Sequence, residues 1–140
     1  MSDAVEQALR ALRHRDRCVA EVDRHLEARG LDEIDRQSAI ATLVRTGVVD
    51  DRRYAESRAS SLADRGAGNA LIRHELLRAG VESDLVEDAL GALAGERERA
   101  ERIVARRGGG AKTARYLAGK GFAEEVVRVV VAHSQGESLG

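Results

Sequence analysis

The chain repeats one six-residue pattern three times, as Leu26-Glu27-Ala28-Arg29-Gly30-Leu31, Leu76-Leu77-Arg78-Ala79-Gly80-Val81 and Leu117-Ala118-Gly119-Lys120-Gly121-Phe122. Each copy has a leucine, three further residues, a glycine and a hydrophobic residue. Glycine readily adopts the left-handed conformation that ends a helix, and the following hydrophobic residue then folds back onto the last turn. The pattern therefore predicts three helix ends of the Schellman type.

Between these ends, apolar residues recur at helical spacing, and glycines interrupt the pattern about every dozen residues. Several interruptions lead into a residue that suits the start of a helix, such as Asp32, Asp50 and Ser83. The segment Val126–Val131 is rich in β-branched residues. A single strand would have no partner in this chain, so a helix is predicted there too. The sequence thus predicts about nine short helices joined by tight loops.

The spacing of the repeated pattern indicates how these helices are grouped. The copies lie roughly 40–50 residues apart, and each is followed by an acidic helix start and another apolar stripe, which is typical of helical-repeat proteins. We therefore predict an all-α fold, an elongated array of three tandem three-helix repeats. The predicted repeats are residues 1–49, 50–95 and 96–133, followed by a flexible tail at 134–140.

Composition supports a folded helical protein. The 140 residues are 43% hydrophobic and 34% charged, which argues against disorder, and the absence of proline with only 2% aromatic residues favours helices over sheets. No apolar stretch approaches the roughly 20 residues of a membrane span, and the first residues do not resemble a secretory signal. The single cysteine, Cys18, agrees with a reducing compartment. We expect a cytoplasmic monomer.

The formal net charge is −1, so any affinity for nucleic acid must come from a local excess of basic residues. Such an excess lies in the last third of the chain, where Glu101 is the one acidic residue within the cluster. The predicted partner-binding or DNA-binding residues are Arg99, Arg102, Arg106, Arg107, Lys112, Arg115 and Lys120. The first three are spaced to share one helix face. The alternative is a solvated face of an arginine-rich protein.

Other polar combinations give no catalytic, metal or cofactor prediction. Asp50 and Asp51 are adjacent and point apart on a helix start, which favours an N-cap and a dipole partner over a metal pair. The stretch Gly108–Thr113 lacks the glycine directly before lysine that a phosphate-binding loop requires. His14, Cys18 and His25 are too few for a typical zinc site. We expect no enzymatic activity.

Several motifs along the chain resemble the RecX family of recombinase regulators. The most specific are Asp50-Asp51-Arg52-Arg53-Tyr54-Ala55 and the segment from Arg65-Gly66-Ala67-Gly68 to Ile72-Arg73-His74-Glu75-Leu76, and the resemblance extends from about Ala8 to Val130. Arg58 departs from the aromatic residue that many relatives carry there. The residues that match the family motifs are Asp50, Asp51, Tyr54, Gly66, Gly68, Glu75, Gly80, Gly121 and Phe122.

The resemblance implies a fold and a function. It implies three tandem three-helix units that lie in the groove of the RecA filament on single-stranded DNA and reduce its ATP hydrolysis and strand exchange, in recombination, repair and the SOS response. Direct DNA binding would be weak. The alternative from another class is a helix-turn-helix DNA-binding module, with Ala114–Lys120 or Leu71–Arg78 as its recognition helix.

Overall fold

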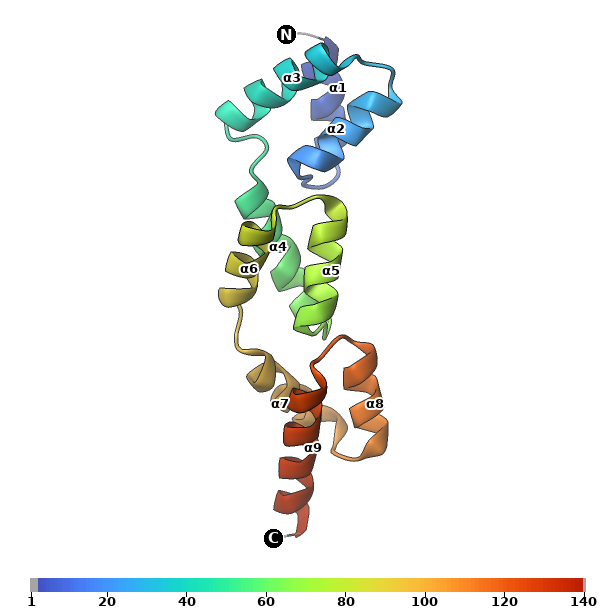
Figure 1. The fold of residues 1–140 in the computed structure, drawn as a ribbon, viewed down its shortest axis with the longest axis vertical. Helices are drawn as coiled ribbons and strands as arrows, with labels where there is room; N and C mark the ends of the chain where they lie inside the picture. The colour runs from blue at the N-terminus through green and yellow to red at the C-terminus, as the bar shows by residue number, and fades with distance from the viewer. Residues whose placement is uncertain (1–2, 140) are drawn as a thin grey trace.

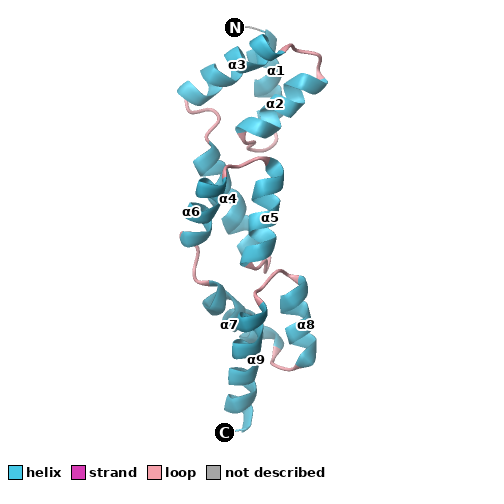
Figure 2. Ribbon diagram, in the orientation of Figure 1, coloured by secondary structure: helices cyan, strands magenta, loops and turns pink. Residues whose placement is uncertain are grey.

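The computed structural model describes the backbone of residues 3–139 and the side chains of residues 3–134. Within this part of the chain all regular structure is helical (Figure 2), which confirms the predicted all-α class. The helices are α1 (Asp3–Leu12), α2 (Val19–Ala28), α3 (Glu33–Arg45), α4 (Asp51–Asp64), α5 (Asn69–Ala79), α6 (Ser83–Gly91), α7 (Glu96–Arg107), α8 (Ala111–Gly119) and α9 (Glu124–Leu139).

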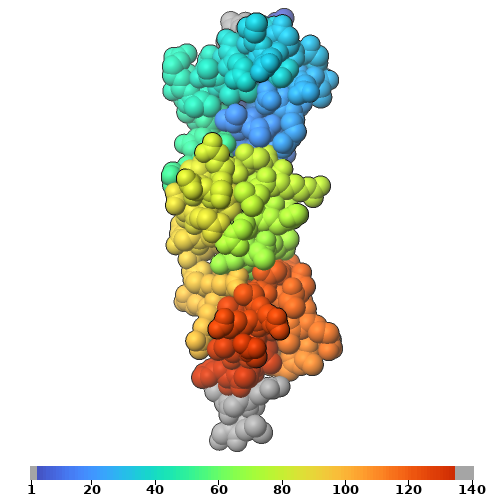
Figure 3. Space-filling view, in the orientation of Figure 1, coloured from blue at the N-terminus to red at the C-terminus, as the bar shows by residue number. Residues whose placement is uncertain are grey.

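The helices form three units of three, α1–α3, α4–α6 and α7–α9, placed one after another along a single axis (Figure 1). The termini lie at opposite ends, and the space-filling view shows three successive bodies (Figure 3). The extensive helix contacts are all made within a unit. The predicted elongated array of three-helix repeats is therefore confirmed.

Each unit has its own apolar core. Leu26 and Leu43 are central to the first core, Ile72 and Leu76 to the second, and Leu117 to the third. Burial of side chains of this size stabilises each core by roughly 1.5–3 kcal/mol per residue. Because the cores are separate, the shape of the array depends on the contacts between neighbouring units.

All three predicted Schellman ends are present. The amide of the hydrophobic residue donates to the carbonyl of the leucine five positions earlier, for Leu31 to Leu26 at 3.2 Å, Val81 to Leu76 at 3.1 Å and Phe122 to Leu117 at 3.1 Å. The intervening glycines have φ values of +88°, +106° and +90°. A fourth such end lies at residues 62–67, where Ala67 donates to Leu62. Ala67 is too small to stand out as a closing hydrophobic residue, so the sequence pattern does not reveal it.

The C-terminal helix resolves the ambiguous valine-rich segment. Val126–Val131 lies within α9, as predicted, with Val127 and Val130 buried in the third core. The same helix continues to Leu139, so the segment 134–139, predicted as part of a flexible tail, has helical backbone. The last residue of that predicted tail, Gly140, lies outside the described residues.

Candidate partner-binding site

The middle helices of the three units, α2, α5 and α8, follow one another along one side of the array (Figure 1). The C-terminal end of α5 lies against the N-terminal end of α2, and the C-terminal end of α8 lies against the N-terminal end of α5. A Cβ atom on Gly80, which ends α5, would come within 2.4 Å of the Ala20 Cβ at the start of α2. A Cβ atom on Gly121, which ends α8, would come within 2.7 Å of Leu71 near the start of α5. Both glycines therefore permit the units to approach closely, in addition to ending their helices.

An acidic residue joins the units at each of these two junctions. Asp51, the first residue of α4, accepts a hydrogen bond through Oδ1 from the backbone amide of Val19, the first residue of α2, at 2.8 Å. Glu96, the first residue of α7, accepts from the amides of Asn69 at 2.6 Å and Ala123 at 3.0 Å. Each later unit thus caps the middle helix of the unit before it, in the same way twice.

The two adjacent aspartates therefore have different partners. Asp50 accepts from the amide of Arg53 at 3.1 Å and is the N-cap of α4, as predicted. Asp51 was predicted to act on the dipole of its own helix, but its carboxylate also satisfies a helix of the neighbouring unit. Burial at the junction raises the pKa of Asp51 above its ordinary value. Because this contact joins segments 32 residues apart, local sequence gives no indication of it.

Cys18 is also part of the first junction. Its side chain is buried and packs with the core of the second unit, and its Sγ donates to the carbonyl of Ala79 at 3.3 Å. The guanidinium of Arg24 donates to the same carbonyl at 2.8 Å. Burial raises the pKa of the Cys18 thiol. These contacts make Cys18 a structural residue at the end of α5.

The structure corrects the prediction that Arg99 belongs to an exposed basic face. It is only 8% exposed and lies in the second junction, where it donates to the carbonyls of Ala94 at 2.9 Å and Ala67 at 2.8 Å and to Asn69 Oδ1. Burial lowers the pKa of its guanidinium, which also lies 5.9 Å from the ring centre of Phe122. Arg99 therefore ties two units together rather than facing a partner.

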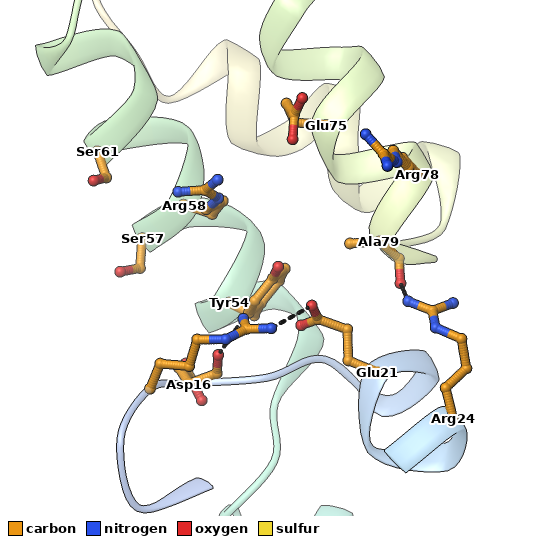
Figure 4. A pocket seen from close by; sticks show the side chains of 11 residues that line it. Asp16, Glu21, Arg24, Tyr54, Ser57, Arg58, Ser61, Glu75, Arg78 and Ala79 are labelled. Carbon is orange, nitrogen blue, oxygen red and sulfur yellow. Dashed lines mark hydrogen bonds and ion pairs between the residues drawn. The ribbon is translucent and has the colours of Figure 1, made fainter. Parts of the chain in front are cut away.

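A polar hollow of about 510 Å³, here called the first groove, opens at the first junction (Figure 4). Its lining comes from α2 and the loop before it, and from α4 and α5. The charged residues that line it are Arg15, Asp16, Glu21, Arg24, Arg58, Glu75 and Arg78. Tyr54 also lines it and is buried, and desolvation raises the pKa of its hydroxyl.

Some of these charges are already paired. Arg15 donates to Glu21 at 3.0 Å, and Glu21 also accepts from the amide of Cys18. Burial alone would raise the pKa of Glu21, but these two donors together hold it below its ordinary value. The Oδ2 atom of Asp16 lies 3.6 Å from Nε of Arg53, so these two side chains also form an ion pair. The first groove thus combines satisfied ion pairs with further charged side chains.

A larger hollow of about 720 Å³, the second groove, opens at the second junction. Arg102 and Arg106 lie along it, and its apolar lining includes Leu93, Ile103 and Phe122. A smaller hollow of about 320 Å³ shares part of this lining and adds three residues, Arg65, Arg107 and Tyr116. The second groove is therefore both more basic and more apolar than the first.

The two grooves share one wall that is equivalent in the repeat, formed by α4 in the first groove and by α7 in the second. Aligning α4 with α7 at Asp51 and Glu96, the residues that cap the preceding unit, pairs the groove residues of one helix with those of the other. The pairs are Tyr54 with Arg99, Ser57 with Arg102, Arg58 with Ile103 and Ser61 with Arg106, and all eight residues line a groove. The same helix face has therefore acquired different chemistry at the two junctions.

The predicted basic cluster is distributed over α7, α8 and the residue after α8. Arg102 and Arg106 are exposed in the second groove, and Arg102 pairs with Glu98 at 3.1 Å. The guanidinium carbon of Arg107 lies 3.7 Å from the ring centre of Tyr116. The remaining exposed or half-buried members of the cluster are Lys112 and Arg115 on α8 and Lys120 after it.

Comparison with known proteins identifies the chain. Residues 50–90 match the family described as "RecX, second three-helix domain". The chain is 34% identical over 134 residues to the "Regulatory protein RecX" of Stenotrophomonas maltophilia (strain K279a), covering 89% of this chain and 82% of that protein. The chain belongs to the RecX family. Its RecX relative from Chromohalobacter salexigens is 34% identical over 138 residues, covering 92% and 91% of the two chains.

Solved RecX structures share the fold. The crystal structure of RecX from Lactobacillus salivarius superposes with a TM-score of 0.79 at 22% sequence identity, covering 94% of both chains. A second structure, of "regulatory protein RecX", has a TM-score of 0.74 at 20% identity and covers 91% of this chain and 69% of that one. The three-unit array is thus an architecture found in other RecX proteins.

The residues that match RecX family motifs divide between the two junctions, with Asp51 and Gly80 at the first and Gly66, Gly68, Gly121 and Phe122 at the second. Gly68 donates its amide to the carbonyl of Lys120 at 2.8 Å, and a Cβ atom on Gly68 would come within 2.4 Å of the Phe122 nitrogen. Gly66 ends α4 with a φ of +90°. Glu75 instead lines the first groove. Most of the motif therefore maintains the array, whereas Glu75 lies on the surface of the first groove.

Other important residues were not among those predicted. Glu96 has the same position after a helix break as Asp51, so alignment of the two helix starts would have revealed it. Arg78 has no sequence signal, and Arg58 stood out only as a departure from the aromatic residue of many relatives. The two lie on different helices, α4 and α5, and line one groove only when these helices pack together.

None of the helices formed by the described residues is both long and apolar enough to cross a bilayer.

Proposed function

We propose that this RecX family member binds the RecA filament on single-stranded DNA and reduces its ATP hydrolysis, recombinase activity and strand exchange. The observation that carries the proposal is the array itself, in which two grooves that share an equivalent helix wall follow one another along the chain. Such a surface suits a partner built from repeating protomers. The protein acts by binding rather than by catalysis, as a monomer in the cytoplasm.

The proposed mechanism depends on several weak contacts made together. Each contact raises the effective concentration of the next, so the array binds an extended partner more tightly than any one unit does. Arg102 and Arg106 in the second groove meet acidic or phosphate groups of the filament, with Lys112 and Arg115 on α8 as further basic contacts. An array bound across neighbouring protomers restrains the movements that hydrolysis and strand exchange require.

The near-neutral net charge limits binding to free DNA. Affinity for a bare polyanion increases with the number of phosphates neutralised, and a chain of net charge −1 offers few such contacts outside its basic cluster. We therefore expect clear selectivity for the filament over bare single-stranded or duplex DNA.

Fluorescence anisotropy tests this proposal with labelled protein titrated against RecA filaments, bare single-stranded DNA and duplex DNA. Wild type is expected to bind filaments at least about tenfold more tightly than either DNA. The variant Arg102→Glu with Arg106→Glu should bind filaments more weakly, whereas the control Arg13→Glu with Arg128→Glu makes the same charge change outside both grooves. Equal affinity for filament and bare DNA would overturn the proposal.

A helix-turn-helix DNA-binding module is the second candidate. A recognition helix places its N-terminal residues in the major groove. The start of α5 is covered, because Gly68 and Ala70 donate to the carbonyls of Lys120 and Gly121, so the geometry disfavours Leu71–Arg78 as a recognition helix. Exposed Lys112 near the start of α8 favours Ala114–Lys120 instead. Footprinting that finds a preferred DNA sequence would support this candidate over the filament regulator.

A further inference from the structure

Two arginines of the first groove lack the partners that its other arginines have. Arg58 on α4 and Arg78 on α5 point into the space between these helices (Figure 4). Arg15 pairs with Glu21, and Arg24 donates to the Ala79 carbonyl. Among the described residues, neither Arg58 nor Arg78 makes an ion pair or a side-chain hydrogen bond. The groove therefore contains two guanidiniums, from two helices, that are available to an anionic group.

The groove also carries an available carboxylate. Glu75 lies one helical turn before Arg78 on α5 and, like it, has no ion pair within the described part of the chain. Asp16 and Glu21 add further negative charge, although Arg53 and Arg15 neutralise them. The first groove therefore offers both signs of charge within a short distance.

This mixed charge distinguishes between two kinds of ligand. A nucleic acid strand brings a row of phosphates, which Glu75 would repel. A protein surface can place a carboxylate against the two arginines and a basic side chain against Glu75, so that every charged group in the groove is satisfied. Arginine forks bind a carboxylate through paired hydrogen bonds, which adds geometric selectivity.

We propose that the first groove is a second docking site for the protein component of the filament, with a partner carboxylate between Arg58 and Arg78 and a partner basic side chain at Glu75. This inference rests on the proposed function, because it takes the partner to be a repeating protein assembly. Since α4 and α7 form an equivalent wall in the two grooves, successive protomers present the same surface element to both walls. Ser57 and Ser61 stand where the second groove has Arg102 and Arg106, so the first groove binds that element more weakly.

Charge reversal in the first groove is the first test. The variant Arg58→Glu with Arg78→Glu is expected to weaken filament binding about tenfold, since two charge-assisted contacts are lost. Its helical circular dichroism should remain that of wild type, because Arg58 is half-buried and Arg78 exposed. The matched control is Arg13→Glu with Arg128→Glu. Filament binding by a folded groove variant that equals the control would overturn the inference.

Glu75→Arg separates a protein partner from a nucleic acid. If the groove contacts protein, this change removes the group that holds a basic side chain, and filament binding falls several-fold while affinity for bare single-stranded DNA stays low. If the groove follows DNA, the added arginine strengthens binding to both, which would contradict the inference.

Grafting the second groove onto the first tests their equivalence. Ser57→Arg with Ser61→Arg recreates the arrangement of Arg102 and Arg106, and arginine is well tolerated in a helix. Tighter filament binding than wild type is expected, and unchanged or weaker binding by a folded variant counts against a shared partner element. Failure of wild type to bind filaments at all would instead refute the proposed function, so the two failures can be told apart.

Discussion

The two junctions of the array have the same plan but are held by different kinds of contact. Both have an acidic residue that caps the preceding middle helix and a glycine that permits close approach. The first junction otherwise depends on side chains, chiefly Cys18 and Arg24. The second adds two backbone hydrogen bonds, from Gly68 to Lys120 at 2.8 Å and from Ala70 to Gly121 at 3.1 Å.

The difference indicates where the array is stiff. Backbone hydrogen bonds between units, together with the buried guanidinium of Arg99, hold the second junction through several independent contacts. The first junction has no backbone hydrogen bond between units among the described residues and is held by side chains, including the pairing of Arg53 with Asp16 at 3.6 Å. We therefore expect the first unit to open from the array more readily than the third, since no backbone hydrogen bond between units has to break for it to open.

The largest expected effect comes from removing the buried arginine. Arg99→Ala leaves the Ala67 and Ala94 carbonyls and the Asn69 side chain without their donor, and unsatisfied buried groups are costly. The free energy of unfolding, measured with urea, should fall by about 3 kcal/mol. The control Arg102→Ala loses one exposed ion pair and should change it by less than about 1 kcal/mol. Equal losses for the two variants would show that Arg99 does not join the units.

A smaller loss of unfolding free energy is expected where the backbones of the second and third units come into contact. Gly68 has a φ of −83°, which any residue adopts, so Gly68→Ala tests contact alone. The added Cβ would lie 2.4 Å from the Phe122 nitrogen and 2.5 Å from the Gly121 carbonyl, and we expect about 2 kcal/mol of destabilisation. Gly91→Ala is the control, because its Cβ would meet nothing within 4 Å. A Gly68→Ala protein as stable as wild type would mean that the second junction is loose.

The smallest effect on the free energy of unfolding is expected from removing the acidic cap at the first junction. Asp51→Ala removes the cap of α2 and should cost about 1 kcal/mol, whereas Asp51→Asn keeps an oxygen acceptor for the Val19 amide and should cost less. Thermal and urea unfolding measure both. A loss as large as that of Arg99→Ala would make the junctions equally strong and remove the contrast between them.

The pH dependence of Asp51 has a definite sign. Because its pKa is raised in the folded protein, folding favours the protonated carboxyl, so lowering the pH from 7 toward the ordinary value of about 3.9 stabilises wild type relative to Asp51→Asn. The unfolding free energy of wild type minus that of Asp51→Asn should therefore increase as the pH falls over that range. A difference that does not change with pH would mean that the carboxylate is not desolvated at the junction.

The sequence predicted local features well and contacts between units poorly. The Schellman ends, the N-cap Asp50 and the helical Val126–Val131 depend on neighbouring residues, so their patterns are readable. The role of Arg99 depends on residues about 30 positions away, and helical spacing alone placed it on an exposed face. Likewise, the pairing of Asp51 with α2 requires knowledge of how the units stack.

The candidate site shows the same limit. Arg102 and Arg106 share a groove because they lie on one helix, which spacing predicts. Lys112 and Arg115 are close to them in sequence but lie on a separate helix, α8, which follows the loop at 108–110. Arg58 and Arg78 are brought together only by the packing of α4 and α5.

The most direct test of the account is the steady-state ATP hydrolysis of RecA on single-stranded DNA, titrated with this protein below an equimolar ratio. The array is predicted to lower the rate at these ratios, because one bound molecule contacts more than one protomer. The groove variants Arg102→Glu with Arg106→Glu and Arg58→Glu with Arg78→Glu should each inhibit less. An unchanged rate with excess, correctly folded wild-type protein would contradict the account.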